Sequence, residues 1–123
     1  MGQKVLIVED ELIVAEDLKL MLETWNYEVI GTVASGKTAL RLSKQLRPDI
    51  LLMDVRIEGN LNGVETALAI RSFFGEEIPV VFLSGRPSNE NPIISAMGKY
   101  IYVNKPFTQQ ELLSAVKSFE GNN

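Results

Sequence analysis

The chain has 123 residues, enough for one domain over 1–123, and 46% of them are hydrophobic, which allows a buried core. Its 12 basic and 16 acidic side chains give a formal net charge of −4, which argues against nucleic acid or an anionic membrane as the main partner. The sequence contains neither cysteine nor histidine, which excludes disulfides, thiolate or imidazole metal ligands, and acid–base catalysis by histidine.

Apolar runs alternate with segments of helical periodicity along the whole chain. In chain order we predict a strand at 5–8, a helix over 14–25, a strand at 28–34, a helix over 39–46 that Pro48 ends, a strand at 50–53, a helix over 64–74, a strand at 78–83, a short helix from about Pro92, a strand at 100–103 and a last helix over 112–119. This alternation predicts an α/β fold with a five-stranded parallel sheet and helices on both faces. The flavodoxin-like, doubly wound order 2-1-3-4-5 is the common one at this length.

Three carboxylates follow the predicted first and third strands. Glu9 and Asp10 come directly after the first strand, and Asp54 ends the third. In the order 2-1-3-4-5 the sheet reverses between these two strands, and ligands bind at that point. Carboxylates this close repel one another unless protons or a cation neutralise them, and a ligand set made only of oxygens favours Mg²⁺. The alternative is that these acids merely cap the helices that follow.

Two further polar side chains are predicted to reach the same edge of the sheet. Ser84 ends the fourth strand, and Lys105 follows the fifth. A hydroxyl and an ammonium opposite an acid cluster form a site for a phosphoryl group, because Mg²⁺ and Lys105 would offset its charge. Taken singly, each would be interpreted as an ordinary surface residue.

Residues 31–38 match the Walker A pattern of nucleotide-binding loops, which makes a small nucleoside triphosphatase a rival hypothesis. A phosphate-binding loop needs the strand to end at its first glycine, whereas Thr32 and Val33 continue the β pattern. The interior of the segment also lacks the glycines that turn backbone amides inward. We therefore favour the interpretation that Ser35 caps a helix and Gly36 relaxes the turn.

The segments 5–11, 51–54, 82–85 and 105–107 occur in an order that resembles the receiver domain of two-component signalling, the CheY-like family. The resemblance implies that Asp54 is the phosphoacceptor and that Glu9, Asp10 and the backbone carbonyl of Arg56 hold Mg²⁺ with it. The loop after Asp54 departs from many receivers, because it is longer and lacks the usual proline.

The resemblance also implies roles for residues around the acids. Ser84 and Lys105 would contact the phosphoryl group, and a cis peptide between Lys105 and Pro106 would aim the lysine at the acids. Tyr102 matches the family's aromatic switch position, although a tyrosine that simply packs on the sheet is a serious alternative. Arg56 and Arg86 would flank the path of an attacking water and slow self-dephosphorylation; the alternative is that both side chains lie in solvent and only add local positive charge.

The function implied is a switch that takes its phosphoryl group from a sensor histidine kinase or a phosphotransfer protein, since the chain has no histidine of its own. Turnover as an independent enzyme is not expected, and the output partner is not evident. A homodimer through the last helix and last strand is a further expectation, and a phosphorylation-independent scaffold is the alternative. We expect a cytoplasmic protein, because the sequence shows no signal-peptide pattern and no membrane-length apolar run.

Overall fold

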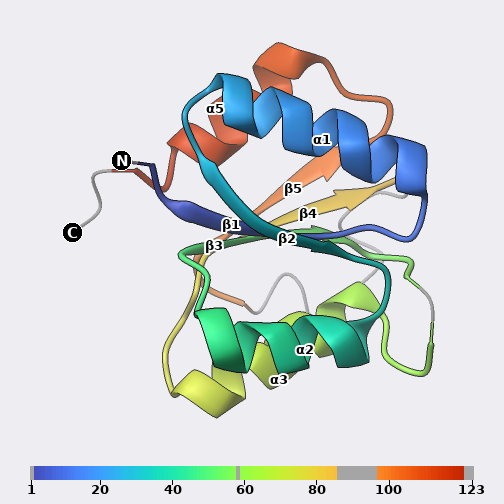
Figure 1. Cartoon of the computed structure of the whole chain (residues 1–123), viewed down its shortest axis with the longest axis vertical. Helices are drawn as coiled ribbons and strands as arrows, with labels where there is room; N and C mark the ends of the chain where they lie inside the picture. The colour runs from blue at the N-terminus through green and yellow to red at the C-terminus, as the bar shows by residue number, and fades with distance from the viewer. Residues whose placement is uncertain (1, 58, 86–96, 121–123) are drawn as a thin grey trace.

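The computed structural model describes residues 2–57, 59–85 and 97–120, and it shows a sheet between two layers of helices (Figure 1). The five strands are parallel and lie in the order β2-β1-β3-β4-β5, so the predicted fold class and strand order are confirmed. Their bounds are β1 Lys4–Val8, β2 Glu28–Val33, β3 Ile50–Asp54, β4 Val80–Ser84 and β5 Tyr100–Asn104.

Helices α1 (Leu12–Thr24) and α5 (Gln109–Lys117) cover one face of the sheet, and α2 (Gly36–Leu46) and α3 (Gly63–Phe74) cover the other (Figure 1). The helix predicted near Pro92 lies outside the described residues. Because β1, β3 and β4 are covered on both sides, almost every residue in them is buried, and the alternating side chains divide between two cores. Ile7 and Leu52 face α1 and α5, whereas Leu6 and Met53 face α2 and α3.

Helices α1, α2 and α5 begin two or three residues before the predicted positions, and two other boundaries differ by two residues for a local reason. Strand β4 begins at Val80 instead of residue 78, because Pro79 has no N–H for the ladder; its carbonyl still accepts from the backbone of Leu51. Helix α5 ends at Lys117, so Phe119 lies beyond it, although its ring still packs against the core. The apolar pattern in the sequence therefore continues past the end of the helix, because Phe119 packs on the core without being helical.

The backbone after β3 is held against the start of α3 at a glycine. The N–H of Gly63 donates to the carbonyl of Val55 at 2.8 Å. A Cβ atom at Gly63 would lie 2.2 Å from the carbonyl oxygen of Asp54, so only glycine allows this approach. The next turn of α3 is fixed by a capping box between Asn62 and Glu65. The loop beside Asp54 is thus anchored at both ends.

Candidate functional site

The three predicted carboxylates meet at the carboxyl ends of the adjacent strands β1 and β3. Oxygen atoms of Glu9, Asp10 and Asp54 all lie within 4.8 Å of one another. Glu9 and Asp54 are buried, at 3% and 6% exposure, whereas Asp10 is exposed. The order reversal between β1 and β3 therefore places two buried acids and one accessible acid in a single cluster, as the sequence predicted.

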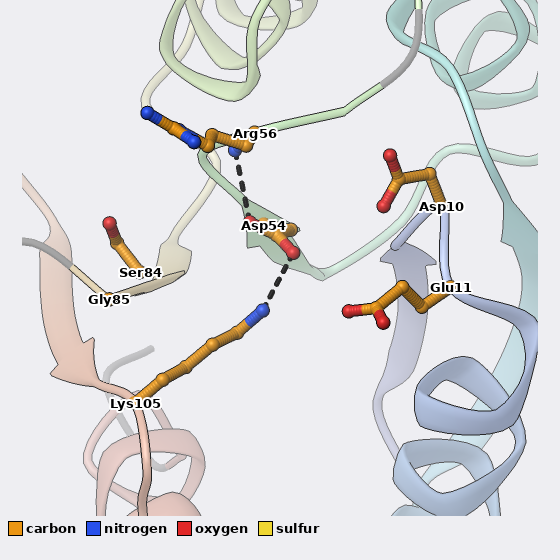
Figure 2. Close-up of a pocket in the computed structure, with 7 residues that line it drawn as sticks. All are labelled: Asp10, Glu11, Asp54, Arg56, Ser84, Gly85 and Lys105. Atoms are coloured by element: carbon orange, nitrogen blue, oxygen red, sulfur yellow. Dashed lines mark hydrogen bonds and ion pairs between the residues drawn. The ribbon is translucent and has the colours of Figure 1, made fainter.

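The carboxylate of Asp54 is held by two donors (Figure 2). The backbone N–H of Arg56 donates to Oδ1 at 3.0 Å, and the ammonium of Lys105 donates to Oδ2 at 2.8 Å. Lys105 reaches this position from the end of β5, where its own N–H donates to the carbonyl of Ser84. The peptide between Lys105 and Pro106 is cis, as predicted.

The acids and the lysine change one another's protonation. The pKa of Glu9 is raised to about 7, chiefly by burial and also by the neighbouring Asp54, whereas the N–H of Glu11 and the charge of Lys105 oppose the shift. Burial alone would lower the pKa of Lys105, but Asp54 and then Glu9 outweigh it, and that pKa is raised. Lys105 is therefore charged, and burial favours a proton on Glu9 when no cation is bound.

One oxygen of the cluster has no hydrogen-bond partner among the described residues. Glu9 Oε1 is buried, and the Nζ atom of Lys105 lies 3.6 Å away, beyond hydrogen-bond length. A buried carboxylate oxygen of this kind is costly unless a proton or a cation satisfies it. Hard oxygen donors in this number suit Mg²⁺, and the described residues fit that ion.

Asp10 and Asp54 open onto a pocket of about 490 Å³ whose lining residues are Asp10, Glu11, Asp54, Arg56, Ser84, Gly85 and Lys105. In Figure 2, Asp10 and Glu11 lie on one side of Asp54 and Ser84 lies on the other, with Lys105 reaching between them. Glu11 and Gly85 were not predicted; the only signal in the sequence is that they adjoin Asp10 and Ser84. The pocket can accept a small anionic group against Asp54.

The remaining predicted site residues lie farther from the acids or outside the described chain. Tyr102 lies on β5 opposite Phe82, two residues before the pair formed by Ser84 and Asn104, and it packs partly buried against the core on the α2 side. Arg86 lies outside the described residues.

The Walker A segment has the structure of a strand followed by a capped helix. Thr32 and Val33 belong to β2, and the hydroxyl of Ser35 accepts from the N–H of Thr38 at the start of α2. A Cβ atom at Gly36 would lie 2.1 Å from the hydroxyl of Thr66, so this glycine is required for the contact between α2 and α3. The capping interpretation accounts for the motif without a nucleotide.

Comparison with known proteins gives consistent matches over nearly the whole chain. The family model of the response regulator receiver domain matches residues 5–117. The chain is 29% identical to the DNA-binding response regulator MtrA of Mycobacterium tuberculosis over 119 residues, which is 96% of this chain and 50% of that protein. The chain thus spans about half the length of the curated relatives it matches.

Solved structures show the same fold. A putative response regulator from Chloroflexus aurantiacus is 31% identical with a TM-score of 0.86, covering 97% of this chain and 98% of that one. The receiver domain of the sensor histidine kinase PA1611 from Pseudomonas aeruginosa is 29% identical with a TM-score of 0.81, covering 99% and 100%. That structure has a magnesium ion coordinated in its active-site cleft.

Among the described residues, no helix has the length and apolar character to cross a membrane. The acidic triad is typical of the Mg²⁺ site of receivers, and its pocket is consistent with a switch that accepts a phosphoryl group. With the fold, the acidic cluster and the family match over residues 5–117 in agreement, the chain belongs to the response regulator receiver domain family of two-component signalling.

Proposed function

We propose that this receiver domain, taken as one unit over 1–123, is a switch in which Asp54 accepts a phosphoryl group from a phosphohistidine of a partner protein. The observation that carries the proposal is the setting of Asp54, which is 6% exposed, bonded to Lys105 and to the N–H of Arg56, and open to the pocket. Family membership implies a histidine kinase as partner, and the chain itself has no histidine that could serve as donor.

In the transfer, an oxygen of Asp54 forms a bond to phosphorus while the bond between phosphorus and the imidazole nitrogen breaks, and the electron pair returns to the imidazole. The ammonium of Lys105 lies 2.8 Å from Asp54 Oδ2. It therefore lies close to the reacting carboxylate, whichever of the two oxygens attacks phosphorus. Its charge offsets the repulsion between the carboxylate and the incoming phosphoryl oxygens.

Mg²⁺ is the proposed cofactor, held by Glu9, Asp10, Asp54 and the backbone carbonyl of Arg56. The proposal is supported by the three carboxylates within 4.8 Å and by Oε1 of Glu9, which is buried and has no hydrogen-bond partner in the described part of the chain. When bound, Mg²⁺ supplies positive charge that neutralises the acids and draws in phosphoryl oxygens.

Ser84 and Tyr102 are the proposed switch residues. Ser84 is buried at the end of β4 and lines the pocket, so its hydroxyl can donate to a phosphoryl oxygen on Asp54. When Ser84 moves toward the phosphoryl group, it leaves space that the side chain of Tyr102, half-buried on the adjacent strand, can fill. A local change of charge then alters the surface of β5 and α5, through which two phosphorylated copies are expected to form a homodimer.

The proposal is tested by incubating the protein with Mg²⁺ and acetyl phosphate and looking for an adduct that hydroxylamine removes. We expect labelling of the wild type and of Asp17→Asn, a matched change of an exposed aspartate on α1, and none of Asp54→Asn. Labelling of Asp54→Asn at the wild-type level would contradict the phosphoacceptor assignment. An unlabelled wild type would favour a phosphorylation-independent scaffold.

A further inference from the structure

The large apolar side chains that are exposed in the described part of the chain lie on two opposite sides of the molecule. Three of the six are on α1, namely Leu12, Ile13 and Leu20, at 73%, 78% and 66% exposure. The other three, Leu46, Leu68 and Phe73, are on α2 and α3. Because these helices cover opposite faces of the sheet, the two apolar surfaces point away from each other (Figure 1).

The exposed side of α1 is acidic as well as apolar. Glu16, Asp17 and Glu23 are exposed, and their helical spacing places them on the same side of the helix as Ile13 and Leu20. We call this surface the α1 face and define it by Leu12, Ile13, Glu16, Asp17, Leu20 and Glu23. The only basic residue within α1, Lys19, is half-buried.

The surface on the opposite side of the sheet has the reverse charge. Helix α2 contains no acidic residue, and Lys37, Arg41 and Lys44 form an exposed row at spacings of four and three residues. Lys44 Nζ lies 4.8 Å from the centre of the Phe73 ring, which is 53% exposed, so the basic row borders an accessible aromatic ring. We call Lys37, Arg41, Lys44 and Phe73 the α2–α3 face.

We propose that this protein associates with itself head to tail, with the α1 face of one copy docked on the α2–α3 face of the next. Each face offers exposed apolar area, and the two carry opposite charge, whereas two α1 faces or two α2–α3 faces would repel. Because the two surfaces differ, the contact is heterologous, and it adds copies in a row or closes them into a ring. This inference does not depend on phosphorylation of Asp54.

The test uses two variants that each remove one face. Lys37→Glu/Arg41→Glu reverses the charge of the α2–α3 face, and Ile13→Ser/Leu20→Ser removes apolar area from the α1 face; all four positions are exposed, so folding is retained. Sedimentation equilibrium of the unphosphorylated proteins over a range of concentrations measures the mass of each. We expect the wild type to exceed a dimer, each variant to be a monomer, and an equimolar mixture of the two to form a 1:1 dimer and nothing larger.

Lys117→Glu is the control for charge, since it reverses an exposed base on α5 and is expected to behave as the wild type. A wild type that remains monomeric overturns the proposal. This holds even if an acidic amphipathic peptide or DNA binds the α2–α3 face of the monomer. Association that persists in either double variant alone also overturns it, because that result points to another interface such as β5 and α5. Circular dichroism of each variant shows whether it is folded, so that a lower mass of the assembly can be assigned to the lost contact and not to unfolding.

Discussion

Arg56 contributes to the site through two separate groups. Its backbone N–H holds Asp54 Oδ1, and its exposed side chain lines the pocket. A side-chain substitution therefore leaves the hydrogen bond to Asp54 in place. The guanidinium can donate to phosphoryl oxygens in a fork, and its length obstructs water that must approach in line with the leaving carboxylate oxygen. It cannot act as a general base, because it stays protonated.

For this reason we expect Arg56→Asn to lose its phosphoryl group faster than the wild type. Decay of the labelled protein after removal of acetyl phosphate gives the rate. Arg41→Asn, the same change at an exposed position on α2, is expected to decay as the wild type does. Decay of Arg56→Asn that is unchanged or slower would refute the role of the side chain. Arg86→Glu extends the test to the second predicted arginine.

Lys37 and Ser35 separate the two interpretations of the Walker A segment. Lys37 is exposed, so Lys37→Ala is expected to change the free energy of unfolding by less than about 0.5 kcal/mol and to leave labelling by acetyl phosphate intact. Ser35→Ala removes the cap of α2 and is expected to cost about 1 kcal/mol. Urea unfolding measures both. ATP binding by the wild type that Lys37→Ala abolishes would restore the nucleotide hypothesis.

At the scale of elements, the sequence predicted what depends on periodicity and adjacency. Apolar runs indicated the strands, and the strand order then brought Glu9 and Asp54 together without any knowledge of side-chain contacts. The close approach of Gly63 to Asp54 could not be predicted, because it depends on the path of an irregular loop. The same holds for Arg71, which is 9% exposed and donates to the carbonyls of Ile78 and Lys99, tying α3 to the starts of β4 and β5.

Another contact that periodicity does not reveal joins the start of β2 to the segment after α5. The hydroxyl of Tyr27, a residue only 5% exposed, donates to Glu120, 93 positions along the chain. Burial first, and then the hydrogen bond and charge of Glu120, raise the pKa of Tyr27 above its usual value of 10.0. The native state therefore holds this proton more tightly than the unfolded chain, and the resulting stability is present below pH 10.0 and lost as the pH rises above it.

We expect Tyr27→Phe to be less stable than the wild type at pH 8 by about 1 kcal/mol, since the hydrogen bond is lost, and to lose less further stability between about pH 10 and 11. Glu120→Gln keeps an acceptor but removes the charge that opposes ionisation, so its loss of stability at high pH should be intermediate. Urea unfolding at several pH values gives the slopes. Equal slopes for the wild type and Tyr27→Phe would show that Tyr27 does not control the alkaline limit.

At the scale of the whole molecule, the fold presents three surfaces with different chemistry, one at the strand ends and one on each side of the sheet. The acidic pocket opens at the carboxyl ends of the strands, and the helical layers present an acidic apolar surface on one side and a basic aromatic one on the other. The pocket concentrates negative charge that Lys105 only partly offsets. The stability of the entire fold should therefore depend on a divalent cation, because small single domains generally unfold as one unit and the unfolded chain has no such cluster.

We expect Mg²⁺ to raise the melting temperature at constant ionic strength. An ion at ten times its dissociation constant adds about 1.4 kcal/mol to the free energy of unfolding, which is roughly 4–8 °C for a domain of this size. Asp10→Asn removes a proposed ligand whose side chain is exposed and makes no hydrogen bond or ion pair in the described part of the chain. The variant should therefore fold, but Mg²⁺ should no longer raise its melting temperature. Asp17→Asn makes the same change on α1 outside the pocket and should keep the full rise. If Mg²⁺ raised the melting temperature of both variants equally, the ion would be acting elsewhere, and the assignment of the acidic cluster as its site would be wrong.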